Sequence, residues 1–190
     1  MKNLIDQVIK ADRKACQDLY GLFNKSMYNT CLRMIGDQDE ALDALQDTFV
    51  SVFKNIHMLS NADMLPAWIK RICVNTCLKQ IEKKKKLNWT SMDDQTILIN
   101  MNDEDEIVDE EEYATRLDAI QWAVEQLPTK YKIVFNLFAI ENYSHENIAE
   151  LLGIPSATCR SQYMRAKQKI IDLIKTSNYA GSIQKVSTNS

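Results

Sequence analysis

Apolar residues recur at helical spacing through most of the first 90 residues. The clearest segment is 37–56, DQDEALDALQDTFVSVFKNI, in which Asp37 precedes Glu40 by three residues, as in a capping box. The apolar positions that follow have the period of one helix face: Ala41, Leu42, Leu45, Phe49, Val52 and Phe53. The next segment, 57–66 (HMLSNADMLP), breaks this period and ends in Pro66, so we expect a loop there.

A second helix is predicted for 67–86, AWIKRICVNTCLKQIEKKKK. Its apolar face carries Ile69, Ile72, Cys73, Cys77 and Ile81. Arg71, Asn75 and Lys79 are four residues apart and lie on roughly the opposite face. The helix ends in the basic run 83–86, which fits either backbone phosphate contacts or a solvated helix end.

The hydrophobic period is lost after residue 87 and returns at about Glu112. Residues 91–128 contain one Arg and 12 acidic residues, whereas the segments on either side are net basic. We therefore predict a flexible acidic linker at 91–111 between two small domains, 1–90 and 112–176.

The second domain is predicted to contain four helices. Pro128 separates the first two, and the segment 143–175 contains the others. Ser144 and Ser156 are suited to cap these last two helices, and Gly153 suits the turn between them. Two helices joined by a tight turn with Gly are typical of a helix-turn-helix. We expect 177–190 to be a flexible tail.

The last predicted helix has one apolar stripe and one basic side. The stripe consists of Cys159, Tyr163, Ala166, Ile170, Leu173 and Ile174. The residues left facing outward are Arg160, Ser161, Met164, Arg165 and Lys167. Such a face suits the DNA major groove, since Arg pairs with guanine, hydroxyls bond bases or phosphates, and Met contacts a thymine methyl. The alternative interpretation is a merely solvated basic face.

Composition narrows the class of protein. The chain has 190 residues, four Gly and three Pro, so an all-α fold is favoured over a turn-rich β fold. Its net charge of −3 does not argue against DNA binding, because local patches decide that interaction. No apolar run has the length of a membrane span, and the N-terminus becomes charged too early for a signal peptide. The expected location is the cytoplasm.

Catalytic and metal sites are not indicated. Cys73 and Cys77 are one helical turn apart, but no further ligand lies near them in sequence, so we interpret them as small core residues. His57 and His145 lack a catalytic partner pattern, and the acids at 103–112 do not form a rigid octahedral site. We therefore expect no cofactor and no enzymatic activity.

Two blocks of the chain resemble one protein family. The segment LPTKYKIVFNLFAIENYSHENIAELLGIPSATCRSQYMRAK resembles region 4 of the extracytoplasmic-function (ECF) sigma factors of bacterial RNA polymerase. DEALDALQDTF resembles the polymerase-binding helix of region 2, and WIKRICVNTCLK resembles its promoter-melting helix. The resemblance spans about residues 5–175. It implies an all-α protein that binds core polymerase and promoter DNA. Such proteins are commonly held inactive by an anti-sigma partner.

The resemblance also implies site residues. The −35 element would be read by Arg160, Ser161, Met164, Arg165 and Lys167. The −10 element would be engaged by Asn75 with Arg71 and Lys79, and the loop 59–65 would receive a flipped base. The polymerase clamp would be bound by Asp43, Gln46 and Asp47. The acidic linker would either occupy a nucleic-acid channel or serve as a solvated tether.

Three positions depart from the family pattern: Ala157 stands where Gly is usual, Cys159 where an aliphatic residue is usual, and Gln162 where a basic residue is common. They leave the −35 sequence undefined. Two alternatives remain at this point. One is a stand-alone dimeric helix-turn-helix regulator with residues 1–90 as a sensing domain, and the other is an all-helical adaptor for acidic proteins.

Overall fold

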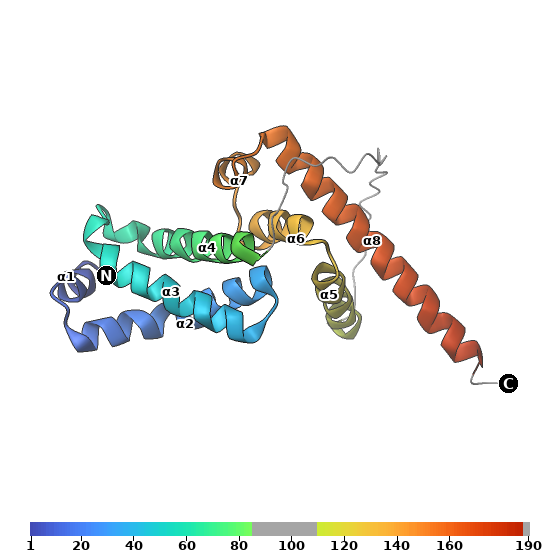
Figure 1. The fold of residues 1–190 in the computed structure, drawn as a ribbon. Coiled ribbons are helices and arrows are strands. Elements are labelled where there is room, and N and C mark those ends of the chain that lie inside the picture. Colours follow the sequence, from blue (N-terminus) through green and yellow to red (C-terminus); the bar gives the residue numbers. More distant parts are fainter. Residues whose placement is uncertain (85–109, 188–190) are drawn as a thin grey trace. The chain divides into compact units, whose positions relative to one another are not determined.

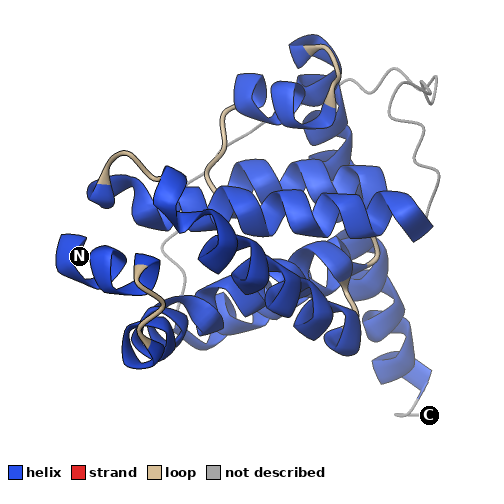
Figure 2. Cartoon of the chain, turned by 60° about the vertical axis from the view of Figure 1, so that its left-hand side comes forward, coloured by secondary structure: helices blue, strands red, loops and turns tan. Residues whose placement is uncertain are grey.

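A computed structural model of the chain describes the backbone of residues 1–84 and 110–187, and the side chains of 1–84 and 116–177. All regular structure in these residues is helical (Figure 2). The chain divides into two compact units, Met1–Leu87 and Asn88–Ser190. The predicted all-α fold with two helical domains is therefore confirmed. The predicted linker lies outside the described residues except for 110 and 111, which belong to a helix.

The N-terminal unit is built on three helices that lie side by side (Figure 1). Its elements are α1 (Lys2–Ile9), α2 (Arg13–Ile35), α3 (Gln38–Asn55), the 3₁₀ turns η1 (Ile56–Met58) and η2 (Ala62–Met64), and α4 (Leu65–Lys84). The helices α2, α3 and α4 each contact the other two, and α1 packs on α2. This arrangement buries the facing stripes of all three long helices.

The turn from α2 to α3 consists of two residues with opposite roles. Gly36 ends α2 with φ +84°, and its N–H donates to the Leu32 carbonyl at 2.8 Å. Asp37 starts α3, since its carboxylate accepts from the Glu40 N–H at 3.0 Å. The cap predicted at Asp37 is confirmed. Leu42 was expected in the apolar face, but it lies at the edge of the buried stripe and remains 52% exposed.

The start of α4 differs from the sequence prediction. The segment expected to be a loop, 57–66, contains both 3₁₀ turns, and α4 begins at Leu65 rather than after Pro66. Proline is tolerated in the first turn of a helix because its missing N–H would have no helical partner there. The predicted buried face is confirmed at Ile69, Cys73, Cys77 and Ile81, whereas Ile72 is only partly buried.

The cysteines of α4 meet a third cysteine from α2. The Sγ atoms of Cys31 and Cys73 are 3.4 Å apart, and Cys77 lies beside both. The neighbouring Cys73 thiol and burial raise the pKa of Cys31 to about 12. The two neighbouring thiols and burial also raise the pKa of Cys77. All three lie in the core, and none of them forms a disulfide.

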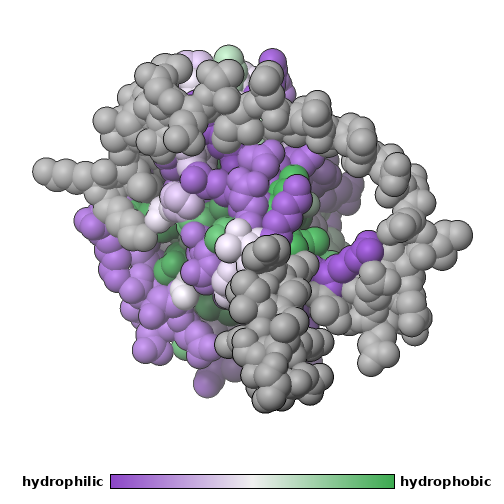
Figure 3. All heavy atoms as spheres, turned by 90° about the vertical axis from the view of Figure 1, so that its right-hand side faces the viewer, coloured by the Kyte–Doolittle hydropathy of each residue, from purple (hydrophilic) through white to green (hydrophobic). Residues whose placement is uncertain are grey.

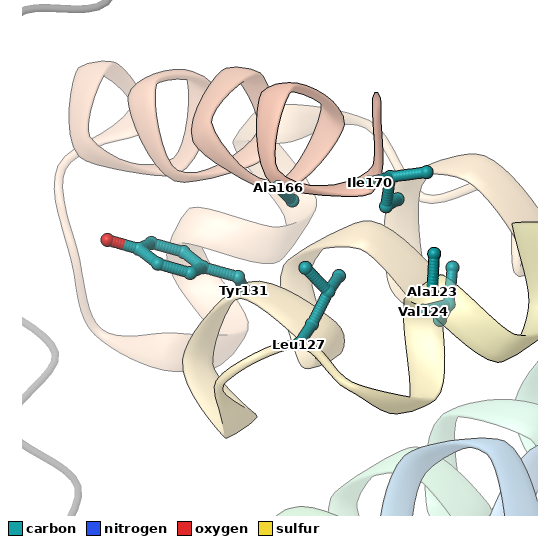
Figure 4. Packing of buried hydrophobic residues seen from close by; sticks show 6 residues of the cluster. All are labelled: Ala123, Val124, Leu127, Tyr131, Ala166 and Ile170. Atoms are coloured by element: carbon teal, nitrogen blue, oxygen red, sulfur yellow. The ribbon is translucent and has the colours of Figure 1, made fainter. Parts of the chain in front are cut away.

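The C-terminal unit packs around one long helix. Its elements are α5 (Glu110–Glu125), α6 (Thr129–Phe135), the π-helical turn η3 (Asn136–Ile140), α7 (His145–Leu152) and α8 (Ser156–Ser187). The helices α5, α6 and α7 all contact α8. Figure 4 shows the core between the end of α5, α6 and α8, formed by Ala123, Val124, Leu127, Tyr131, Ala166 and Ile170.

One prediction for the start of α8 is wrong. Ser156 was expected to cap the helix from outside, but it is the first helical residue, and Pro155 accepts the Cys159 N–H at 3.1 Å. The flexible tail predicted at 177–190 stays a prediction: α8 continues to Ser187, and the last three residues lie outside the described residues. Each residue added to a formed helix gains a hydrogen bond, and no proline interrupts this segment. None of the helices in the described ranges has the length and apolar character that crossing a membrane requires.

Candidate nucleic-acid interface

The helices α7 and α8 are joined by a tight glycine turn. The hydroxyl of Ser144 accepts from the Asn147 N–H at 3.1 Å and caps α7, as the sequence predicts. Gly153 ends α7 with φ +64°, and the next residue, Ile154, donates its N–H to the Ala149 carbonyl at 3.0 Å. These contacts set the angle at which α8 leaves the turn, so the predicted helix-turn-helix is confirmed.

The first turns of α8 have a buried side and an outward side. Cys159, Ala166 and Ile170 are buried, and Tyr163 is half-buried against Phe138, with ring centroids 4.5 Å apart. On the outward side, Arg160 and Ser161 are exposed. The remaining members of the predicted −35 set are partly buried: Met164, Arg165 and Lys167. None of the five lies in the core.

Gln162 is the position where the family commonly has a basic residue. Here its side chain is only 4% exposed, so it faces the interior of the C-terminal unit. A buried charge is costly unless it is paired, whereas a neutral amide is less costly. The position therefore belongs to the packing of α8 and is not available to DNA.

Arg160 is held by an acid of the preceding helix. Its guanidinium donates to the Glu146 carboxylate at 3.2 Å and to the Ser156 hydroxyl at 3.2 Å. The Ser156 hydroxyl also donates to Glu146 at 3.3 Å. A backbone hydrogen bond and the Arg160 contact lower the pKa of Glu146. Sequence reasoning missed Glu146, because it is 14 residues away from Arg160 along the chain.

His145 joins the start of α7 to α8 and η3. Its ring stacks on Phe138, with centroids 4.1 Å apart and an interplanar angle of 8°. Its Nδ1 lies 3.5 Å from the Cys159 Sγ, and Tyr163 is tilted against the same ring at 5.6 Å. Burial and the nearby Arg160 lower the pKa of His145, so the neutral ring is favoured. The sequence indicated no role for this histidine.

The predicted −10 residues lie on the outer side of α4. Arg71 and Lys79 are exposed, and Asn75 between them is partly buried. At the end of the same helix, Lys83 is exposed, whereas the Lys84 ammonium pairs with the Glu40 carboxylate. The other two lysines of the predicted basic run, 85 and 86, lie outside the described residues.

The predicted polymerase-binding residues form an exposed face on α3. Asp43, Gln46 and Asp47 are all exposed. Leu42 and Val50 extend the same face and are 52% and 59% exposed, although apolar side chains of this size are usually buried. The sequence analysis did not predict that these two apolar residues lie on the surface. The spacing of four between Leu42, Gln46 and Val50 was a signal that could have placed them on one face.

Exposed apolar residues are not confined to α3. On the side of the molecule drawn in Figure 3, hydrophilic side chains cover most of the surface that is not grey, with smaller hydrophobic areas between them. In the C-terminal unit, Leu117, Ile120 and Trp122 of α5 are also exposed. Large apolar residues left on a surface commonly mark protein contacts.

Comparisons with known proteins find the same family in both units. Residues 19–87 match the family model for sigma-70 region 2, and residues 117–170 match the model for sigma-70 region 4. Together the two matches cover more than half of the chain. The N-terminal match decides between the alternatives left by the sequence, because a stand-alone helix-turn-helix regulator or an adaptor has no reason to contain region 2.

Individual relatives span nearly the whole chain. The chain is 29% identical to the ECF RNA polymerase sigma factor SigW of Bacillus subtilis, over 90% of this chain and 94% of SigW. It is 27% identical to the sigma factor SigV of the same organism, over 75% and 80% of the two chains.

Solved structures share the fold. CnrH, solved with the cytosolic domain of CnrY, gives a TM-score of 0.54 at 17% identity, covering 91% of this chain and 96% of CnrH. RpoE of Bartonella quintana, solved with the anti-sigma factor NepR, gives a TM-score of 0.55 at 18% identity. The match covers 84% of this chain and 96% of RpoE. The chain belongs to the sigma-70 family of RNA polymerase sigma factors and is of the extracytoplasmic-function type.

Proposed function

We propose that α8 reads the −35 element as duplex DNA, with Arg160, Ser161, Met164, Arg165 and Lys167 on the reading side. The observation that carries this proposal is the division of α8 into a side buried by Cys159, Ala166 and Ile170 and an outward side with basic and hydroxyl groups. A recognition helix needs such an arrangement, because its inner side must hold it in the domain while its outer side enters the major groove.

The outer side of α4 is the proposed −10 surface. Arg71 and Lys79 supply exposed cations that attract the phosphates of a separated strand, and Asn75 between them supplies both donors and an acceptor for a base edge. The segment 59–65 before α4 is proposed to receive a base that has left the duplex stack. Opening the duplex costs a few kcal/mol for each unstacked base, so such contacts are required.

The exposed face of α3 is the proposed contact with core polymerase. Asp43 and Asp47 give it negative charge, and Leu42 and Val50 give it apolar area. A face that combines apolar anchors with charge is typical of specific protein interfaces. A basic surface on the polymerase would complement it.

Regulation and location follow from the same assignment. The two similar solved structures contain CnrY and the anti-sigma factor NepR as partners of those proteins. We propose that this chain also has an anti-sigma partner and that it acts in the cytoplasm, where core polymerase and DNA are found. We further propose that it has no covalent chemistry and acts through binding alone.

A run-off transcription assay with purified core polymerase tests the function. Promoter-dependent transcripts should form only when this chain is added, and Arg165→Ala should reduce −35-dependent initiation on the order of 5-fold to 100-fold, as expected for one lost base contact. Lys175→Ala is the matched control, because Lys175 is exposed on the same helix but lies about two turns beyond the reading side. Wild-type output from Arg165→Ala would contradict the −35 assignment.

A further inference from the structure

Three thiols meet in the core of the N-terminal unit. The Sγ atoms of Cys31 on α2 and of Cys73 and Cys77 on α4 all lie within 4.8 Å of one another, and all three side chains are fully buried. The shortest separation, between Cys31 and Cys73, is 3.4 Å. We call these three residues the thiol cluster. It occupies the side of α4 opposite the proposed −10 residues and contains none of them.

The ligand set is all sulfur. Within the described residues, these three form the only group of three or more His, Cys, Asp or Glu side chains close enough to bind one ion together. Sulfur ligands select soft, thiophilic centres and disfavour Mg²⁺ or Ca²⁺, which prefer oxygen. A centre about 2.3 Å from each of three sulfurs needs sulfur–sulfur separations of roughly 3.4–4.0 Å. The cluster reaches this range with a small contraction.

Burial limits the charge that the site can carry. None of the three side chains has exposed surface, and an uncompensated charge in such a place is strongly unfavourable. Three thiolates with a monovalent ion leave a net charge of −2, and with a divalent ion they leave −1. A trivalent centre leaves no net charge. Structural zinc sites also take four ligands, one more than this cluster offers.

We propose that the thiol cluster binds a trivalent, thiophilic centre of the arsenite and antimonite class. In the reaction with arsenite, As(OH)₃, three As–O bonds break and three As–S bonds form. The three thiol protons leave with the three hydroxide groups as water. Arsenic stays in the +3 state, so no oxidant or reductant is needed, and the product is neutral like the thiols that it replaces.

Binding would connect two helices that are distant in sequence. Cys31 and Cys73 are 42 residues apart, so the three sulfurs come together only when α2 and α4 are packed. A ligand that binds only the folded state stabilises it. Because the sulfurs are fully buried, the ligand must enter through a local opening of the unit, and we expect slow binding.

The test uses the full chain with sodium arsenite. We expect one arsenic per chain after excess monothiol and desalting, and three As–S contacts with no As–O contact by X-ray absorption spectroscopy. Cys31→Ala, Cys73→Ala and Cys77→Ala should each abolish retention, while Cys16→Ala on α2, outside the cluster, should retain arsenic as the wild type does. The absorption measurement on the wild type needs no variant, so it decides the question even where a variant fails to fold.

Several results would overturn the proposal. These are no retained arsenic in the wild type, two or fewer As–S contacts, or retention by a folded Cys77→Ala variant. Parallel incubations of the full chain with Zn²⁺ and with Cu⁺ test the charge argument. Stoichiometric, cluster-dependent binding of either ion in place of arsenite would show that the charge argument is wrong.

Discussion

The guanidinium of Arg160 lies 3.2 Å from the carboxylate of Glu146, so the first basic residue on the proposed reading side of α8 is paired with an acid of α7. Both side chains are largely exposed, at 60% and 65%. An exposed ion pair of this kind exchanges readily with other partners, such as a DNA phosphate. In the proposed −35 contact, the pair would therefore compete with DNA for Arg160.

Glu146→Gln should increase the salt dependence of promoter binding. With its internal partner gone, Arg160 is free to neutralise a phosphate, and the slope of log K against log salt should become steeper by about one. The measurement is a titration of holoenzyme with promoter duplex at several salt concentrations. Glu150→Gln on the same helix removes the same charge without touching the pair, so equal slopes for the two variants would contradict the competition.

His145 should make the C-terminal unit sensitive to acid. Burial and Arg160 lower the pKa of His145 in the folded unit from its ordinary value of 6.5. At a pH just below 6.5, the unfolded chain therefore binds more protons at this histidine than the folded chain does. Stability is therefore fully present above that pH and falls as the pH drops through the range between the two pKa values. Cys159, Tyr163 and Glu146 also lie against this ring. They are the same residues in the wild type and in the His145→Phe variant, so a difference between the two proteins reports on the histidine.

His145→Phe keeps an aromatic ring next to Phe138 but does not titrate. Hydrogen exchange of α7 and α8 at pH 7.5 and pH 5.5 measures the effect. Between these values, the wild type should lose more protection than the variant. His57→Gln, at an exposed histidine of the other unit, should behave as the wild type does. The same loss in wild type and His145→Phe would refute the prediction.

Gly36 and Gly21 should respond to alanine in opposite directions. Gly36 has φ +84°, a conformation in which an L side chain is strained, so Gly36→Ala should destabilise the N-terminal unit by about 1–2 kcal/mol. Gly21 lies in the middle of α2, on its exposed side, and a Cβ added there would meet open space. Gly21→Ala should therefore stabilise the N-terminal unit by about 0.5–1 kcal/mol. Urea unfolding measures both, and a Gly36→Ala variant as stable as the wild type would show that the turn is not strained.

Asp47→Arg should weaken the complex with core polymerase. The residue is exposed on the proposed clamp-binding face, so the change should leave folding intact while placing a like charge against a basic partner. We expect affinity to fall on the order of tenfold or more, as at an interface hot spot. Asp18→Arg on α2 makes the same charge change at another exposed position. An equal loss in that control would indicate a general charge effect.

Much of this protein was predictable from its sequence because the signals lie within single helices. The cap at Asp37, the glycine at 153 and the stripe of Cys159, Ala166 and Ile170 depend on residues a few positions apart. Such neighbours are related by the helical period alone, whatever the helix packs against. The helix-turn-helix and the family resemblance follow from the same local patterns.

The tertiary structure decided every relationship between helices. It paired Arg160 with Glu146, stacked His145 on Phe138, and brought Cys31 to Cys73 and Cys77. It also buried Gln162 and left Leu42 exposed, against the expectation for each residue type. Periodicity shows which residues share a face of one helix. Which of those faces meet, and at what height along each helix, depends on how the helices cross and pack, and this information is not contained in any single segment.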